Sequence, residues 1–81
     1  MKLRMTYNTD PTVVEKIKQI ALLHKGVFST LQPEKNGIEN YVTQEICFDN
    51  IADMNKFIYS AYMTCGYYFL VETIVYTADM F

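Results

Sequence analysis

Apolar and polar residues alternate in several short runs of this 81-residue chain, which is the pattern of half-buried β-strands. The alternation is cleanest at the start, where Leu3, Met5 and Tyr7 are separated by polar residues. One later run is interrupted by Gln44, which falls on its apolar face. The predicted strands are Lys2–Tyr7, Val27–Gln32, Tyr41–Phe48 and Tyr67–Thr77.

Two segments between these runs have apolar residues at the 3.6-residue spacing of an amphipathic helix. Asp10 before Pro11 is a typical helix start, and Asn50 caps the second segment. We expect Gly26 to adopt the left-handed conformation that ends a helix, and Gly66 to end the second helix. The predicted buried stripes are Val13, Val14, Ile17, Ile20, Ala21 and His24 in the first helix, and Ile51, Met54, Ile58, Ala61, Tyr62 and Cys65 in the second, flanked by Phe57 and Tyr59; Leu22 and Met63 are predicted to project outward.

The order strand, helix, strand, strand, helix, strand is that of a split βαβ unit. It predicts an α+β, ferredoxin-like sandwich over residues 1–81, a single domain with both helices on one face of an antiparallel sheet. The connection rules place the strands in the order fourth, first, third, second. Asn36-Gly37 indicates a tight two-residue hairpin between the second and third strands.

The last strand is apolar on both faces and lies at an edge of the predicted sheet. Strand edges with apolar side chains favour pairing with another chain unless charge, proline or a covering segment prevents it. Glu72 is the only charge in this run. We therefore expect a homodimer or a protein partner, unless Met80, Phe81 or the loop at Ile38 covers the strand within a monomer. The predicted outward row is Tyr68, Leu70, Ile74 and Tyr76.

Composition favours an exposed apolar surface over a merely dense core, while the charge excludes little and suggests no polyanion partner. Hydrophobic residues make up 51% of the chain, with seven Tyr and five Phe, which is more than a small core needs. The net charge of −2 and the scattered Lys and Arg make a nucleic-acid partner unlikely, since such proteins carry a basic stripe. No apolar run approaches a membrane span, and Cys47 and Cys65 fit free thiols of a reducing compartment. We expect a cytoplasmic protein.

Catalytic and metal-binding patterns do not emerge from the sequence. His24 has no nucleophile beside it, and with Cys47 and Cys65 it forms no zinc-type spacing. The three glycines are used by helix ends and a turn, which leaves none for a phosphate-binding loop. Acylphosphatases share this order of elements, but they bind phosphate with an Arg where this chain has Asn8-Thr9-Asp10-Pro11. We expect no enzymatic activity and no cofactor.

Two alternatives belong to other functional classes. The stretch from Asp10 to Val14, followed by an apolar helix, resembles the start of an ACT regulatory domain, although Thr12 replaces the family's glycine. The resemblance implies a small ligand near Asp10–Thr12. RNA-recognition domains stack bases on aromatics of the central strands. The outward positions here would be Lys2, Arg4, Thr6, Tyr41, Thr43 and Glu45.

The sequence as a whole predicts a small protein-interaction module, an inhibitor or adaptor that acts through its sheet face and edge strand. A composition rich in Asn, Ile, Lys and Tyr is typical of low-GC genomes and their phages, so a phage or mobile-element accessory protein is one interpretation. The predicted partner-binding residues are Tyr68, Leu70, Ile74, Tyr76, Tyr41 and Arg4.

Overall fold

The predicted order of strands and helices is confirmed by the computed structural model, which describes residues 1–29, 32–35 and 37–75. The topology is ferredoxin-like. A short 3-10 helix, η1, precedes the last strand. The elements are β1 (Lys2–Asn8), α1 (Pro11–Leu23), β2 (Val27–Phe28), β3 (Glu34–Lys35), β4 (Tyr41–Cys47), α2 (Ile51–Cys65), η1 (Gly66–Tyr68) and β5 (Phe69–Val75).

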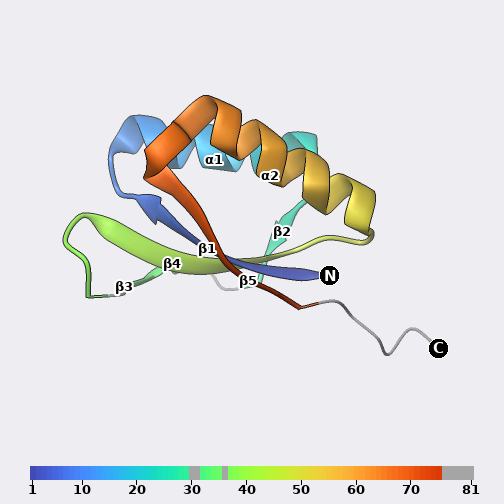
Figure 1. Ribbon diagram of the computed structural model, residues 1–81, viewed down its shortest axis with the longest axis horizontal. Helices are drawn as coiled ribbons and strands as arrows, with labels where there is room; N and C mark the ends of the chain where they lie inside the picture. The colour runs from blue at the N-terminus through green and yellow to red at the C-terminus, as the bar shows by residue number, and fades with distance from the viewer. Residues whose placement is uncertain (30–31, 36, 76–81) are drawn as a thin grey trace.

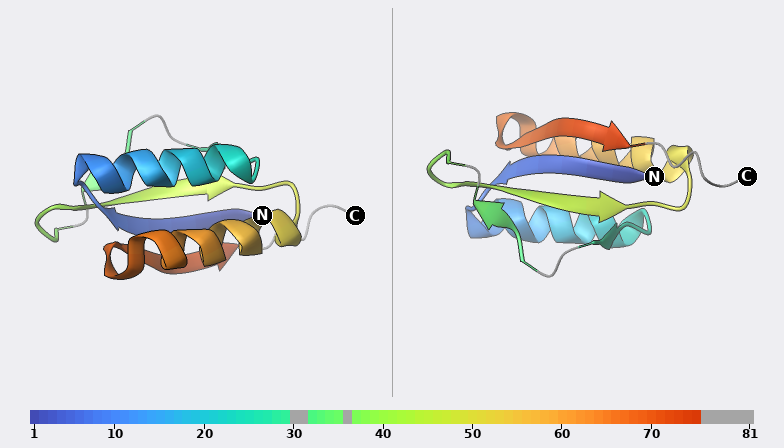
Figure 2. Two further views of the ribbon diagram at one scale, coloured as in Figure 1. Left: turned by 90° about the horizontal axis from the view of Figure 1, so that it is seen from above. Right: turned by 90° about the horizontal axis from the view of Figure 1, so that it is seen from below.

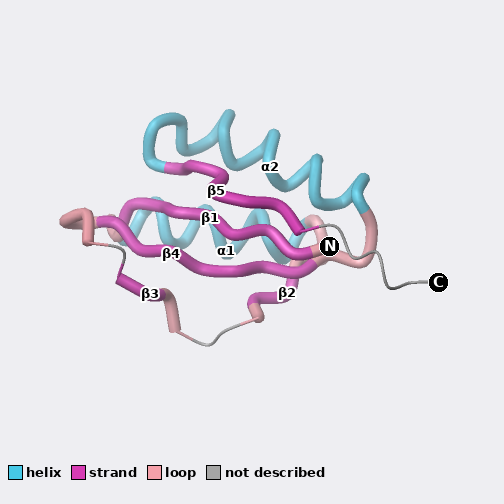
Figure 3. The backbone as a smooth tube through the Cα atoms, turned by 60° about the horizontal axis from the view of Figure 1, so that its bottom comes forward, coloured by secondary structure: helices cyan, strands magenta, loops and turns pink. Residues whose placement is uncertain are grey.

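The sheet has the predicted order, β2-β4-β1-β5, with β3 also paired to β4. Both helices lie side by side on one face of it, while no described element covers the other face (Figures 1 and 2). Each described strand pair is antiparallel. As Figure 3 shows, β5 runs along one edge of the sheet beside α2, and β2 and β3 lie along the opposite edge.

Alternation in β1 decides which face becomes the core. Leu3, Met5 and Tyr7 are buried beneath the helices. Their paired residues on β4 are, in the same order, Ile46, Gln44 and Val42. The predicted interruption at Gln44 has a physical explanation, because the buried Tyr7 hydroxyl donates a hydrogen bond of 2.7 Å to its side-chain oxygen. A polar residue on a buried face is tolerated when it is hydrogen-bonded in this way.

The buried Tyr7 hydroxyl makes the free energy of unfolding decrease at alkaline pH. Burial raises its pKa above the ordinary value of 10.0, so the folded chain holds this proton more tightly than the unfolded chain. The resulting stabilisation is complete below the pKa of the unfolded chain. It is lost as the pH rises through the higher pKa of the folded chain. In urea titrations, we expect the unfolding free energy to fall as the pH rises above the ordinary tyrosine pKa of 10.0, and to fall less steeply in Tyr7→Phe. Equal slopes for the two proteins would contradict this assignment.

Both predicted helix starts are confirmed by their capping bonds. Asp10 accepts a hydrogen bond of 2.8 Å from the backbone N–H of Thr12, with Pro11 in the first turn. Asn50 accepts one of 2.9 Å from the N–H of Asp53. Side-chain oxygens at these positions satisfy N–H groups that have no partner within the helix.

Among the described residues, no helix combines the length and apolar character needed to span a bilayer.

The end of α1 differs from the prediction. Lys25, not Gly26, has the left-handed conformation, with φ of 62°. Gly26 is required for space, because a Cβ there would lie 2.5 Å from Ile46 Cδ1 and 2.9 Å from Phe48 Cε2. Only a residue without a side chain lets the backbone leave α1 and pass this close to the core. Gly66 directly follows the last residue of α2, as predicted, and has a positive φ of 56°.

Of the predicted second strand, Val27–Gln32, the structure describes only Val27–Phe28 as a strand, and a further strand, β3, lies where a turn was predicted. β2 pairs with the end of β4, and β3 pairs with its start, so that both lie along the same edge. The predicted two-residue hairpin is wrong, because Lys35 pairs with Val42 and the residues between them form a longer connection. Asn36 and Leu31 lie outside the described residues. Gly37 has a positive φ of 88°, as a turn residue can.

Aromatic rings dominate the centre of the core under α2. Phe57 is fully buried, and its ring centroid lies 5.3 Å from that of Phe48 and 5.9 Å from that of Phe69. The predicted stripe of α2 is therefore rotated, since Phe57 was assigned to its flank. Ile51 and Tyr62, which were predicted to be buried, are 44% and 41% exposed. This rotation moves part of the helix's apolar surface to the outside.

Candidate functional site

A β-bulge in β5 changes the predicted outward row. β1 and β5 are paired up to Arg4 with Thr73, but the next pair is Met5 with Val71, so Glu72 is the extra residue. An extra residue reverses the alternation of side chains beyond it. Ile74 consequently pairs with buried Leu3 and packs against the core, and the prediction that it faces outward is wrong. Val75, predicted to face the helices, is 57% exposed instead.

The other members of the predicted row are separated from one another. Leu70 lies on the outer face opposite Thr6 and is 54% exposed, as predicted. Tyr68 belongs to η1 rather than to the strand and lines a hollow with Asp10 and Thr64. Tyr76, Met80 and Phe81 lie outside the described residues. The row therefore does not exist as a single stripe in the part of the chain that the structure describes.

The free edge of β5 is blunted by more than Glu72. The Tyr62 hydroxyl accepts a hydrogen bond of 3.3 Å from the backbone N–H of Val71. The tyrosine thus binds a group that an incoming strand would need, and the adjacent bulge bends the strand at the same point. Because of these two features, side chains rather than backbone pairing are the more accessible means of contact at this edge.

The outer face of the sheet is polar and cross-linked. Lys2 and Arg4 each form an ion pair with Glu45, with nitrogen–oxygen distances of 3.7 Å. The Thr6 hydroxyl lies 3.0 Å from that of Thr43 and donates a hydrogen bond to the Glu72 carboxylate. Tyr41 is half-buried at the end of this face. The structure brings Arg4 and Tyr41 to the predicted face, but it does not join them to the apolar residues of β5.

An exposed apolar surface is found instead over the C-terminal half of α2, η1 and the start of β5. Three of its members, Tyr59, Tyr62 and Met63, are neighbours on one side of α2 at spacings of three and four residues. Tyr67 in η1 is 99% exposed, and Leu70 extends the surface onto β5. None of these side chains is charged at neutral pH. We call this surface the α2–β5 patch, and it consists of Tyr59, Tyr62, Met63, Tyr67 and Leu70.

The patch is held rigidly and contains a hollow. Tyr62 packs edge-on against the buried Phe69 ring, with centroids 5.0 Å apart, while its hydroxyl accepts the Val71 bond. Tyr62, Gly66, Tyr67, Phe69 and Leu70 surround a hollow of about 420 Å³. The sequence prediction missed this surface because it assigned Tyr62 to the core. Spacing did predict the outward positions of two of its members, Met63 and Leu70.

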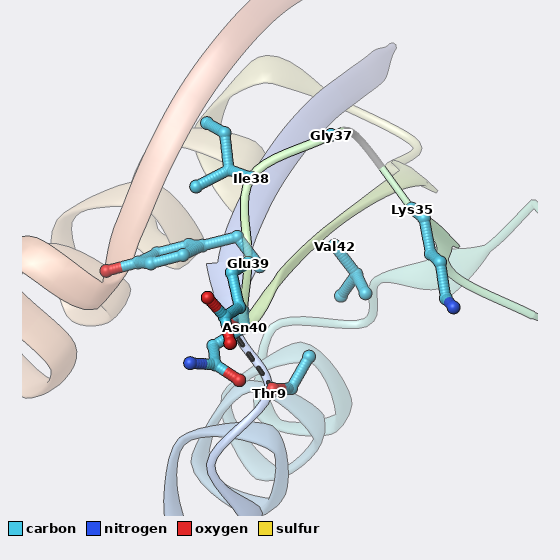
Figure 4. A pocket seen from close by; sticks show the side chains of 8 residues that line it. Thr9, Lys35, Gly37, Ile38, Glu39, Asn40 and Val42 are labelled. Carbon is cyan, nitrogen blue, oxygen red and sulfur yellow. Dashed lines mark hydrogen bonds between the residues drawn. The ribbon is translucent and has the colours of Figure 1, made fainter.

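Hollows elsewhere on the molecule are built mainly from turns and element ends. The one in Figure 4, about 450 Å³, lies beside the turn between β3 and β4, where Thr9 donates its backbone N–H to the Asn40 carbonyl at 2.9 Å. A second, about 460 Å³, lies between α1 and β4 above the Tyr7–Gln44 hydrogen bond. A third, about 330 Å³, lies at the Asp10 turn and includes Lys16.

His24, Cys65 and Cys47 lie on three different elements of the fold. His24 ends α1, and its Nε2 lies 3.3 Å from the Ser60 hydroxyl of α2. Burial raises the pKa of the Cys65 thiol, which lowers its reactivity at neutral pH. Cys47 is half-buried on the outer face. Within the described ranges, His, Cys, Asp and Glu side chains do not gather in threes or more as a metal site requires.

Comparison with known proteins gives no relative from which a function could be taken. No family model matches the chain, and no curated protein and no solved structure is significantly similar to it.

Proposed function

We propose that this chain is a small protein-binding module, without enzymatic activity, that acts as an inhibitor or adaptor through the α2–β5 patch. The observation that carries the proposal is a group of five large, uncharged, exposed side chains. Tyr59 and Met63 lie beside Tyr62 on α2, and Tyr62 lines one hollow with Tyr67 and Leu70. The three tyrosines alone, at 67%, 41% and 99% exposure, present on the order of 300–500 Å². The largest apolar patch on a typical monomer is of this size and is often functional.

The chemistry of the patch is that of a protein interface. Tyr and Met are enriched in such interfaces and charged residues are depleted from their centres. Tyrosine contributes a large contact area at a low cost in conformational entropy, and it offers a hydroxyl to the partner. Tyr62 is already immobilised by Phe69 and Val71, so little further order is lost when a partner binds it.

The test compares partner retention by variants of the α2–β5 patch with retention by a matched variant on α1. In affinity capture from the native source, we expect Tyr67→Ser and Leu70→Ser to weaken retention of the partner at least about tenfold, as truncation of central interface residues does. Leu22→Ser on α1, which is 82% exposed, should leave retention unchanged. Circular dichroism checks that all variants fold.

Loss of the partner in Arg4→Ala and Tyr41→Ala, with retention in both patch variants, would contradict the proposed surface and favour the outer sheet face. If no protein binds in a patch-dependent manner, in either a homotypic or a heterotypic complex, the proposed function itself fails.

A second candidate function is binding of a small ligand at the Asp10 turn, which the resemblance to ACT domains implies. It is favoured by the 330 Å³ hollow there, which has Asp10 and Lys16 on its walls. An acidic and a basic side chain in one hollow suit the ammonium and carboxylate groups of an amino acid. A thermal-shift screen against amino acids and nucleotides tests this candidate. We expect a ligand that raises the melting temperature of the parent protein and not that of Lys16→Ala. If no ligand behaves in this way, the candidate is wrong.

The outer face of the sheet disfavours RNA binding, the other alternative. Its basic side chains Lys2 and Arg4 are both paired with Glu45, and Tyr41 is half-buried. This arrangement offers little to a phosphate backbone or to a stacked base.

A further inference from the structure

The α2–β5 patch has the properties of a contact between two copies of the same chain. We propose that a second copy of this chain occupies it, so that two α2 helices pack antiparallel about a two-fold axis. This inference rests on the proposed function, because it names the partner of the same surface.

The area is suited to a dimer. A stable interface buries about 800 Å² on each partner. The tyrosines supply on the order of half of this, and Met63 and the surrounding rim add to it. A two-fold contact uses the same surface on both subunits, so no second apolar surface is needed elsewhere.

The charge of the patch permits self-association. The chain carries a formal net charge of −2, so two copies repel each other weakly at long range. A contact between identical surfaces also brings like charges together when the surface is charged. The five residues of the patch have no charge at neutral pH, and this local repulsion is therefore avoided.

Two α2 helices can pair antiparallel through the same exposed residues of each copy. In an antiparallel pair centred on position 61, Tyr59 of one copy lies opposite Met63 of the other, and the reverse contact is made at the same time. A methionine sulfur beside an aromatic ring is a favourable contact. The same alignment places Lys56 opposite Gly66 at the C-terminal end of the other helix, where the last turn has no basic residue. A cation is favourable there because the helix dipole leaves partial negative charge.

The experiment uses a pair of charge variants and sedimentation equilibrium. One variant carries Tyr59→Lys with Met63→Lys, and the other carries Tyr59→Glu with Met63→Glu. Both positions are exposed, at 67% and 69%, so both variants are expected to fold. The parent protein should have twice the 9.5 kDa mass of one chain at micromolar concentration. Each variant alone should be monomeric through like-charge repulsion, and an equimolar mixture should recover the dimer.

The matched control is Leu22→Lys, which places the same charge on the exposed face of α1 and should leave the dimer intact. A monomeric parent at micromolar concentration would overturn the inference, and so would a mixture that remains monomeric. If the parent is monomeric while capture of another protein still depends on Tyr67 and Leu70, the proposed function stands and only the second copy is wrong. If the parent dimerises but Leu22→Lys abolishes the dimer, the contact lies on α1 and the inference also fails.

Discussion

Replacement of Phe57 by alanine is expected to lower the free energy of unfolding by about 3–5 kcal/mol, the range for large aromatic residues in a core. Phe57 is fully buried and contacts the rings of Phe48 and Phe69, so its removal leaves a cavity bounded by both. A small domain has a total stability of only about 5–15 kcal/mol. The variant should therefore unfold at a much lower urea concentration than the parent, as measured by circular dichroism.

Tyr59→Ala is the matched control, because it truncates an aromatic residue on the same helix that is 67% exposed. Its effect should stay below about 0.5 kcal/mol when measured at sub-micromolar concentration, where association contributes little. The comparison also tests the rotation of α2. If Tyr59→Ala were as costly as Phe57→Ala, the helix would present a different face to the core than the structure describes.

Replacement of Gly26 by alanine is expected to destabilise the fold by about 1–3 kcal/mol, as overpacking does. The added Cβ would meet Ile46 and Phe48, which are themselves buried and can move only by disturbing their neighbours. Lys25→Gly should have the opposite sign and stabilise by about 0.5–1 kcal/mol, because it relieves a positive φ of 62°.

Urea unfolding of these two single variants distinguishes the two explanations for the glycine. If Gly26 served as the left-handed residue, as the sequence suggests, Lys25→Gly would bring no stabilisation and would cost chain entropy. A stable Gly26→Ala variant would likewise contradict the close approach to Ile46.

The parts of this fold that sequence could predict are those set by local chemistry. β1 follows from strict alternation around Leu3 and Met5, and the helix starts follow from Asp10 and Asn50, whose side chains cap N–H groups only two or three residues away. The strand order followed from general connection rules. Each of these features requires knowledge of a few neighbouring residues and no knowledge of distant contacts.

What sequence missed depends on contacts between distant segments. The bulge at Glu72 is defined only by the pairing of β5 with β1, and it exchanged the faces of Ile74 and Val75. The rotation of α2 was hidden because apolar residues surround much of that helix, so that spacing alone does not decide between Phe57 and Tyr62 as core members. The α2–β5 patch was missed for the same reason.

The bulge at Glu72 also makes the free edge of β5 a poor template for fibril growth. Amyloid growth requires an edge on which strands can stack in register, each satisfying the full row of backbone groups on the next. β5 is divided at Glu72 into two short segments, and its Val71 amide is bound by Tyr62. A straight strand can match one of these segments but not both. A chain that is 51% hydrophobic can therefore present large aromatic side chains to a partner while its exposed strand remains a poor template for endless addition.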